Sequence, residues 1–178
     1  MIAVWERRMF RGYLTAVALF LCASAPASAA DQKNWSPPSH KIYAQQLSDA
    51  TMKAHLELLS VTLHGVPPGM NDAYTMFAGS YPDRIGNTDD PDDIDVSKKG
   101  ITIVDPRWHR TKDPSPKFVV LMPLRDRAGE NVGLVVYAFK VSAESNAGER
   151  KFYLKALDLR DALARRIPSY AALFAAAP

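Results

Sequence analysis

Two of the four histidines, His55 and His64, lie in one apolar stretch and are the first candidates for metal binding or catalysis. If that stretch is a regular helix, their spacing puts them on opposite faces, so they would not share a metal. The residues after His55 do not complete a His-Glu-x-x-His zinc motif. We interpret His64 as a structural cap, because the helix dipole favours its charged form; contact with a ligand is the alternative.

A run of aspartates in the middle of the chain could bind calcium. Its members are Asp89, Asp90, Asp92, Asp93 and Asp95. The run lacks the glycine at the sixth position and the closing glutamate of an EF-hand loop. Acidic side chains at the start of a helix also offset its macrodipole without any metal. We therefore predict no metal site and no cofactor.

Aromatic, methionine and arginine side chains on the predicted strands could line a pocket for a small anion or an amphipathic ligand. With the histidine considered above, the candidates are His64, Tyr74, Met76, Arg84, Met122 and Tyr137. Strand residues alternate between two faces, so the tyrosines and methionines are equally well explained as core. Arg84 is the sharpest candidate, because a charge close to the Gly86 turn needs a partner.

No pattern of residues indicates a reaction. The chain has no nucleophile elbow and no phosphate-binding loop, and its single cysteine lies near the N-terminus. A basic and aromatic cluster, Arg107-Trp108-His109-Arg110, lies in a proline-flanked loop and is interpreted as a solvated surface. We predict that the protein is not an enzyme and does not bind nucleic acid, and a small exported hydrolase is the least favoured alternative.

Helical periodicity appears at both ends of the chain. Apolar residues recur at spacings of three and four between residues 38 and 64, where a glycine and two prolines follow. The same spacing predicts a second helix over 149–167, and Ser169 could cap one further turn over 170–174. These two helices should cover a sheet.

The middle of the chain has the period of strands. Strands are predicted over 73–80, 101–104, 117–124 and 132–140, with a hairpin connection between the last two. Residues 81–86 are predicted as a loop or short edge strand, and 105–116 as a loop. A short helix should begin at Pro91 and end before Gly100. The order of elements predicts an α+β domain around an antiparallel sheet.

Residues 1–29 have the composition of a secretory signal peptide. Three arginines precede the apolar run 13–22, and Ala27-Ser28-Ala29 is a suitable cleavage site. The run is shorter than the roughly 20 residues that span a membrane, although an uncleaved anchor is the competing interpretation.

Cleavage would remove three arginines and the only cysteine from a chain of 178 residues whose net charge is only +3. The remainder is nearly neutral, which argues against nucleic-acid binding. We expect a periplasmic or secreted bacterial protein without membrane insertion, with 30–37 as a disordered leader.

Four stretches resemble the extracellular PAS-like sensor modules called Cache domains. They are His64–Gly69 after the long helix, Arg84-Ile85-Gly86 with the acidic run and Gly100, Val120–Asp126 with its Pro-Leu-Arg-Asp phrase, and Gly129–Val136. The resemblance covers about residues 38–167 and leaves 168–178 as a C-terminal tail. It implies a five-stranded antiparallel sheet with the long N-terminal helix on one face and a small-molecule pocket on the other.

The resemblance implies a domain that binds a small molecule for sensing. Family members usually belong to histidine kinases or chemoreceptors, whereas this chain shows no output domain. We therefore predict a stand-alone binder that relays to a partner, with a membrane-bound signalling protein or a second copy in a homodimer as the protein partners to consider. The alternative is a periplasmic structural or interaction protein without a ligand. No ligand class follows, because the family's amino-acid motif is not matched.

Overall fold

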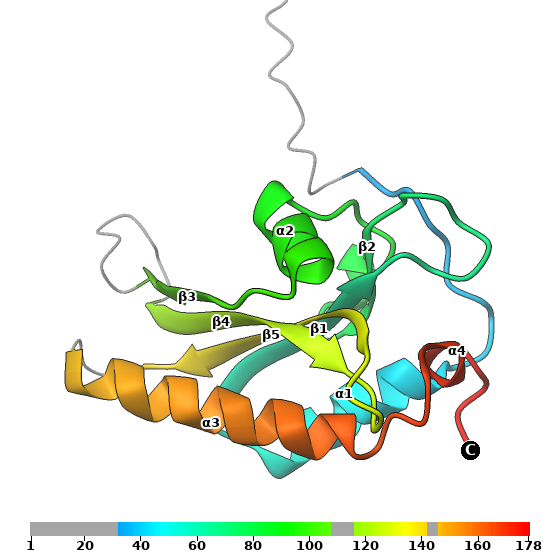
Figure 1. Ribbon diagram of the computed structural model, residues 1–178. Coiled ribbons are helices and arrows are strands. Elements are labelled where there is room, and N and C mark those ends of the chain that lie inside the picture. Colours follow the sequence, from blue (N-terminus) through cyan, green and yellow to red (C-terminus); the bar gives the residue numbers. More distant parts are fainter. Residues whose placement is uncertain (1–31, 108–115, 142–145) are drawn as a thin grey trace, which may run out of the picture.

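The computed structural model describes residues 32–107, 116–141 and 146–178, which form one antiparallel sheet with helices on both faces (Figure 1). The five strands lie in the order β2-β1-β5-β4-β3. In chain order the elements are α1 (Tyr43–Ala54), β1 (Leu58–Gly65), β2 (Thr75–Gly79), the 3-10 helix η2 (Pro82–Arg84), α2 (Pro91–Lys99), β3 (Ile103–Pro106), β4 (Lys117–Arg125), β5 (Asn131–Lys140), α3 (Asn146–Ala164) and α4 (Tyr170–Leu173). The predicted α+β class and five-stranded antiparallel sheet are confirmed.

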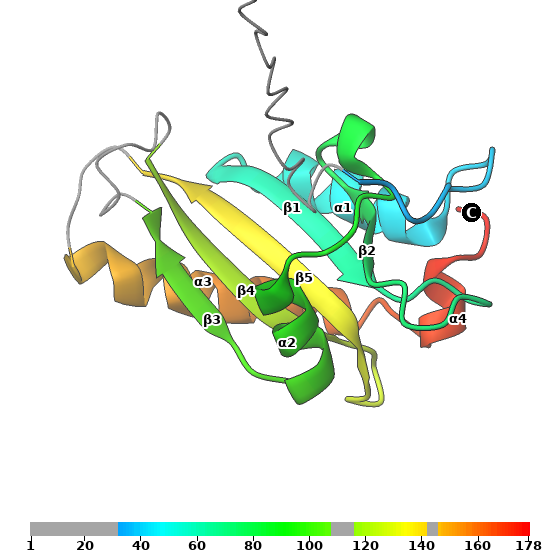
Figure 2. The ribbon, with the colours of Figure 1, turned by 90° about the horizontal axis from the view of Figure 1, so that it is seen from above.

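The helices divide unequally between the two faces of the sheet. In Figure 1, α1 and α3 lie on one side and α2 lies on the other, and Figure 2 shows α2 from above the strands. The main core joins the sheet to α1, α3 and α4. A smaller cluster joins Val96 of α2 to the opposite face of β4 and β5. One face is therefore covered broadly and the other only in part.

Strand β4 places apolar side chains on both faces of the sheet. Phe118, Val120 and Met122 belong to the main core, whereas Val119 and Leu121 belong to the smaller cluster under α2. The alternation follows from the two-residue period of a strand. A strand with apolar side chains at both sets of positions must be covered on both sides, as the burial of β4 shows.

The predicted long helix over 38–64 is wrong in its second half. Helix α1 ends at Ala54, the chain turns at residues 56–57, and β1 begins at Leu58. Val61 and Leu63 enter the main core, while Thr62 and His64 face the other way. The three-and-four spacing was misleading because this apolar run also fits a two-residue alternation, and β-branched side chains favour a strand.

This correction removes the helical interpretation of the histidines. His64 lies near the end of β1, so it does not cap the C-terminal end of a helix; instead it lies beside the first turn of α2, which holds Asp93. His55 follows α1 and is hydrogen-bonded to Glu57. The argument that they lie on opposite faces of one helix therefore does not apply.

Both ends of the described chain are part of the fold. Residues 32–36, expected in a disordered leader, pair with the loop after η2: the N–H of Asn34 donates to Gly86 at 2.9 Å. Gly86 has a φ of +90°, and a Cβ there would collide with the carbonyl oxygen of Trp35. Trp35 in turn packs edge-on against Phe174 of the predicted tail, with ring centroids 6.3 Å apart. The domain therefore extends beyond 38–167 in both directions.

Several local predictions are confirmed. Helix α2 begins at Pro91 and ends before Gly100, which has the left-handed conformation. The Ser169 side chain accepts a hydrogen bond from the N–H of Ala172 and caps α4. Residues 81–86, predicted as a loop or a short edge strand, form a loop that contains the 3-10 helix η2.

Two predictions fall wholly or partly outside the described residues: the signal peptide and, apart from Arg107, the basic cluster. Within the ranges that are described, no helix has both the length and the apolar character to cross a membrane.

Candidate functional site

A cavity of about 200 Å³ lies on the partly covered face of the sheet, between the strands and α2. Its polar floor comes from β1, where alternation turns Ser60, Thr62 and His64 toward the same side. Met76 of β2 lies beside them, and apolar side chains from β4 and β5 complete the floor. The cavity therefore begins where α2 no longer covers the strands.

Charged side chains of both signs surround the opening of the cavity. Asp90, Asp92 and Asp93 come from the start of α2. The basic side chains are Arg84 of η2, Arg107 directly after β3, and Lys117 of β4. The chain brings them together because η2 and α2 follow one another above the sheet, and β3 pairs with β4. A small molecule with an anionic group would find donors at this opening.

Arg84 and Arg107 differ in their surroundings. Arg107 Nε donates to Asp105 Oδ2 at 2.9 Å, so part of its charge is already balanced. The Arg84 guanidinium lies 5.6 Å from the centre of the Tyr81 ring, and no carboxylate of the described residues forms an ion pair with it. Arg84 is also exposed. It is therefore the more available of the two for an anionic ligand.

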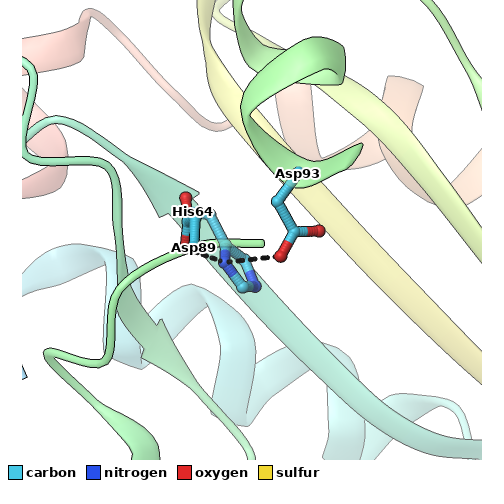
Figure 3. Close-up of side chains that lie close together, drawn as sticks. All are labelled: His64, Asp89 and Asp93. Carbon is cyan, nitrogen blue, oxygen red and sulfur yellow. Dashed lines mark hydrogen bonds and ion pairs between the residues drawn. The ribbon is translucent and has the colours of Figure 1, made fainter. Parts of the chain in front are cut away.

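A buried hydrogen-bonded chain forms one wall of the cavity (Figure 3). His64 Nδ1 lies 2.7 Å from Asp89 Oδ1, and His64 Nε2 lies 2.7 Å from Thr62 Oγ1. Asp93 Oδ2 lies 3.9 Å from the same Nδ1 atom. Thr62 and His64 are alternate residues of β1. Asp89 and Asp93 lie in the loop before α2 and in its first turn. Tertiary structure brings these two segments together.

Strand packing fixes the position of His64. Gly133 of β5 has a φ of +130°, and a Cβ there would collide with the carbonyl oxygen of His64. On the other side, the register between β1 and β2 shifts after Leu63, which leaves Phe77 as an extra residue and brings Met76 opposite His64. The two strands therefore hold His64 between a close backbone contact and a bulge.

The charges in this wall influence one another. Burial by itself lowers the pKa of His64, but the charge and hydrogen bond of Asp89, together with the charge of Asp93, outweigh it and raise the pKa above its usual value. Burial raises the pKa of Asp93 to about 6, and the carboxylates of Asp89, Asp92 and Asp90 add to this, while His64 opposes it. The wall therefore concentrates negative charge that a cation would stabilise.

The structure brings together half of the residues predicted to bind a ligand. His64, Met76 and Arg84 line the cavity. Tyr74 lies in a separate hollow beside Gly65, with the Lys98 ammonium 5.0 Å from the centre of its ring.

Met122 and Tyr137 do not line the cavity, because they point to the other face of the sheet. Both are fully buried in the main core. They follow the same alternation that turns Leu121 and Val136 toward the cavity. Both residues were also considered as core residues, and the packing agrees with that interpretation.

Sequence reasoning missed Thr62 and gave Asp89 and Asp93 a purely helical explanation. Thr62 and His64 are two residues apart, and this spacing predicts that they share a face only if the segment is a strand. Asp89 precedes α2, and only 4% of the surface of the whole residue is exposed. A residue that only starts a helix at the surface would be solvated. Its burial could not be inferred from the run of aspartates.

No protein-family model matches the chain, and no curated protein matches it either. Among solved structures, the Escherichia coli DcuS sensor domain is similar at 20% identity and a TM-score of 0.38, over 55% of this chain and 66% of that chain. The GAF domain of the Acinetobacter phosphoenolpyruvate-protein phosphotransferase is similar at 13% identity and a TM-score of 0.43, over 71% and 84%.

The C-terminal domain of the E. coli transcriptional regulator KdgR is similar at 13% identity and a TM-score of 0.42, over 75% of this chain and 100% of that chain. The match to the DcuS sensor domain covers 66% of that domain, slightly less than two thirds of its length. No family membership follows, so the cavity itself carries the functional proposal.

Proposed function

We propose that this protein is an exported sensory domain that binds a small polar ligand in the cavity between β1 and α2. The observation that carries the proposal is a cavity of about 200 Å³ lined by polar and charged side chains on a sheet face that is otherwise apolar. The floor carries polar side chains from β1 and the opening carries charged ones, so a ligand with polar groups would find hydrogen-bond partners there.

Arg84 would bind an anionic group of the ligand. Its guanidinium is exposed at the opening of the cavity, and within the described residues it forms no ion pair with a carboxylate. A guanidinium can donate two parallel hydrogen bonds to a carboxylate or phosphate. Met76 and the side chains of β4 and β5 would contact the less polar part of the ligand.

The signalling part of the proposal follows from the position of α2. This helix contributes side chains to the cavity and packs on the sheet through Val96, so a bound ligand would touch both α2 and β1. A change in their relative position would reach the surface of the domain, where a membrane-bound partner or a second copy could detect it. Export by the N-terminal signal peptide would place this event in the periplasm.

The test begins with protein purified from cells that express the full chain. Native mass spectrometry of that protein would reveal a small molecule that is retained during purification. Calorimetric titration and thermal unfolding with amino acids, carboxylates and purines would then identify the class, because a ligand raises the midpoint of unfolding of the state that it binds.

The decisive variant is Arg84→Ala, with Arg165→Ala as its control. Arg165 follows α3, is exposed, and does not line the cavity. We expect Arg84→Ala to weaken binding at least about tenfold, as loss of a charged hydrogen bond should, and Arg165→Ala to leave it unchanged. If no compound class binds, or if both variants bind as well as the wild type, the proposal fails.

A further inference from the structure

His64, Asp89 and Asp93 bring three metal-ligating side chains to one point of the cavity wall. One nitrogen and two carboxylate oxygens from these residues all lie within 4.8 Å of one another. Figure 3 shows the side chains converging from β1, from the loop that precedes α2, and from α2 itself. Asp89 and Asp93 belong to one acidic segment, and the fold brings that segment against His64 of β1, which precedes Asp89 by 25 residues.

We propose that this cluster is a binding site for one divalent transition-metal ion, with Zn²⁺ as the reference ion. The donors would be His64 Nδ1 and one carboxylate oxygen each from Asp89 and Asp93. An imidazole with two carboxylates suits Zn²⁺ and its neighbours better than Ca²⁺ or Mg²⁺, which prefer oxygen ligands alone. The proposal stands whether or not the cavity also binds an organic ligand.

The distances are compatible with this assignment. Donors around a tetrahedral Zn²⁺ lie about 3.3–3.5 Å apart, given zinc bonds of about 2.0–2.2 Å. Here Nδ1 is 2.7 Å from Asp89 Oδ1 and 3.9 Å from Asp93 Oδ2. Displacements of less than about 1 Å would bring both of these distances into that range. A metal ion would replace the hydrogen that now joins Nδ1 to Asp89.

The surroundings of the cluster include the support that a metal-bound histidine requires. With Nδ1 on the metal, Nε2 carries the hydrogen and donates it to Thr62 Oγ1, which lies 2.7 Å away. Such a hydrogen bond fixes the tautomer and the orientation of the ring. Thr62 lines the cavity beside His64 on the same face of β1.

Asp89 provides an independent observation. Its side chain is only 1% exposed, and its Oδ2 atom is buried without a hydrogen-bond partner in the described part of the chain. A buried carboxylate oxygen without a partner is costly, because burial has removed its water. A cation bound to this carboxylate would offset part of that cost.

The position of Asp93 keeps the proposed site open on one side. Its side chain is 16% exposed and lines the cavity. Three protein ligands would therefore leave a coordination position toward the cavity, as in zinc sites that bind water or another small molecule. The site would bind a metal ion in proportion to its concentration, or it would bind a ligand that coordinates that ion.

The test uses tag-free protein, treated with a chelator and then titrated calorimetrically with Zn²⁺ and, separately, with Ca²⁺ and Mg²⁺. We expect one Zn²⁺ per chain, bound at least about a hundredfold more tightly than Ca²⁺ or Mg²⁺. Asp93→Asn should weaken Zn²⁺ binding at least tenfold. Asp95→Asn, which removes a carboxylate of the same helix that pairs with Lys99 and does not line the cavity, should change it less than twofold.

A histidine pair tests the nitrogen ligand. His64→Gln should abolish tight Zn²⁺ binding, and His55→Gln should preserve it, since His55 lies outside the cluster. If His64→Gln fails to fold, the comparison of Asp93→Asn with Asp95→Asn decides alone. The proposal is overturned if Zn²⁺ does not bind below millimolar concentration, if Ca²⁺ binds equally well, or if Asp95→Asn weakens binding as much as Asp93→Asn. Because Arg84 is not part of the cluster, the Arg84 test can fail or succeed independently of this one.

Discussion

The two faces of the sheet are built from the same strands but differ in how apolar they are and in how fully the helices cover them. On the face toward α1, α3 and α4, alternate residues of every central strand enter one apolar core, including Phe118 and Phe139, which are fully buried. On the face toward α2, β1 presents serine, threonine and histidine, and only part of the surface is apolar. The first face contributes most of the buried apolar core, and the second contributes less apolar burial and contains the cavity.

The largest expected effect concerns the strand contact that both faces share. Gly133→Ala should lower the free energy of unfolding by about 3 kcal/mol or more, because it combines an unfavourable φ of +130° with a collision against the His64 backbone. Chemical denaturation measures the loss. Gly129→Ala is the control: its φ of +87° is also unfavourable, but no atom lies within 4 Å of the new Cβ, so about 1 kcal/mol is expected. Equal losses would show that the close contact is unimportant.

Adjacent valines of β4 compare the two faces directly. Val120 is fully buried in the main core, whereas Val119 lines the cavity. Val120→Ala should cost about 2–3 kcal/mol, since it loses buried methyl groups and leaves a void. Val119→Ala should cost about 1 kcal/mol, because its side chain already borders open space. Urea denaturation of both variants measures the difference, and a larger loss at Val119 would contradict the assignment of the faces.

Asp93 should make the cavity face less stable at neutral pH. Its folded-state pKa of about 6 exceeds the ordinary value of 3.8, so the unfolded chain loses this proton more readily and stability falls as the pH rises from about 4 to 6. Asp93→Asn should therefore stabilise the metal-free protein at pH 7 by about 1–3 kcal/mol. Denaturation in the presence of a chelator, at pH 5 and pH 7, measures this effect.

The control for this prediction is Asp95→Asn on the same helix. Asp95 pairs with Lys99 at 2.7 Å on the exposed side of α2, so its loss should change stability by less than about 0.5 kcal/mol at either pH. A destabilised Asp93→Asn variant at pH 7 would mean that the attraction between Asp93 and His64 outweighs the burial of the carboxylate.

The smallest expected effects are at the helix starts of the two faces. Ser169 caps α4 on the covered face, and Ser169→Ala should cost about 0.5–1 kcal/mol. Asp90 occupies the same position in α2 but makes no side-chain capping bond, so Asp90→Ala should cost only a few tenths of a kcal/mol. Thermal unfolding of both variants measures the two losses of stability. A larger loss for Asp90→Ala than for Ser169→Ala would contradict the prediction.

Local signals were sufficient for the elements with one dominant pattern. The hairpin of β4 and β5, the start of α2 at Pro91, its end before Gly100, and the Ser169 cap were all predicted from a few neighbouring residues. The segment 58–65 was not, because an apolar run of this length fits either a helix or a strand. What decides it is pairing with β2 and β5, which no local pattern contains.

The candidate site shows the same division. Arg84, Met76 and His64 were predicted as ligand contacts and lie at the cavity, although whether they bind a ligand stays a prediction. Met122 and Tyr137 were candidates for either the pocket or the core, and they lie in the core; the sequence gives the alternation within a strand but not which set faces which layer.

By itself, the sequence determined the α+β class, the strong hairpin, the helix ends and the near neutrality of the chain after residue 29. These properties depend on the composition and spacing of neighbouring residues, so they can be read along the chain. The tertiary structure alone decided that Thr62, His64, Asp89 and Asp93 meet in one wall. Their meeting depends on strand pairing and on the place of α2 above the sheet, which are interactions between segments far apart in the chain.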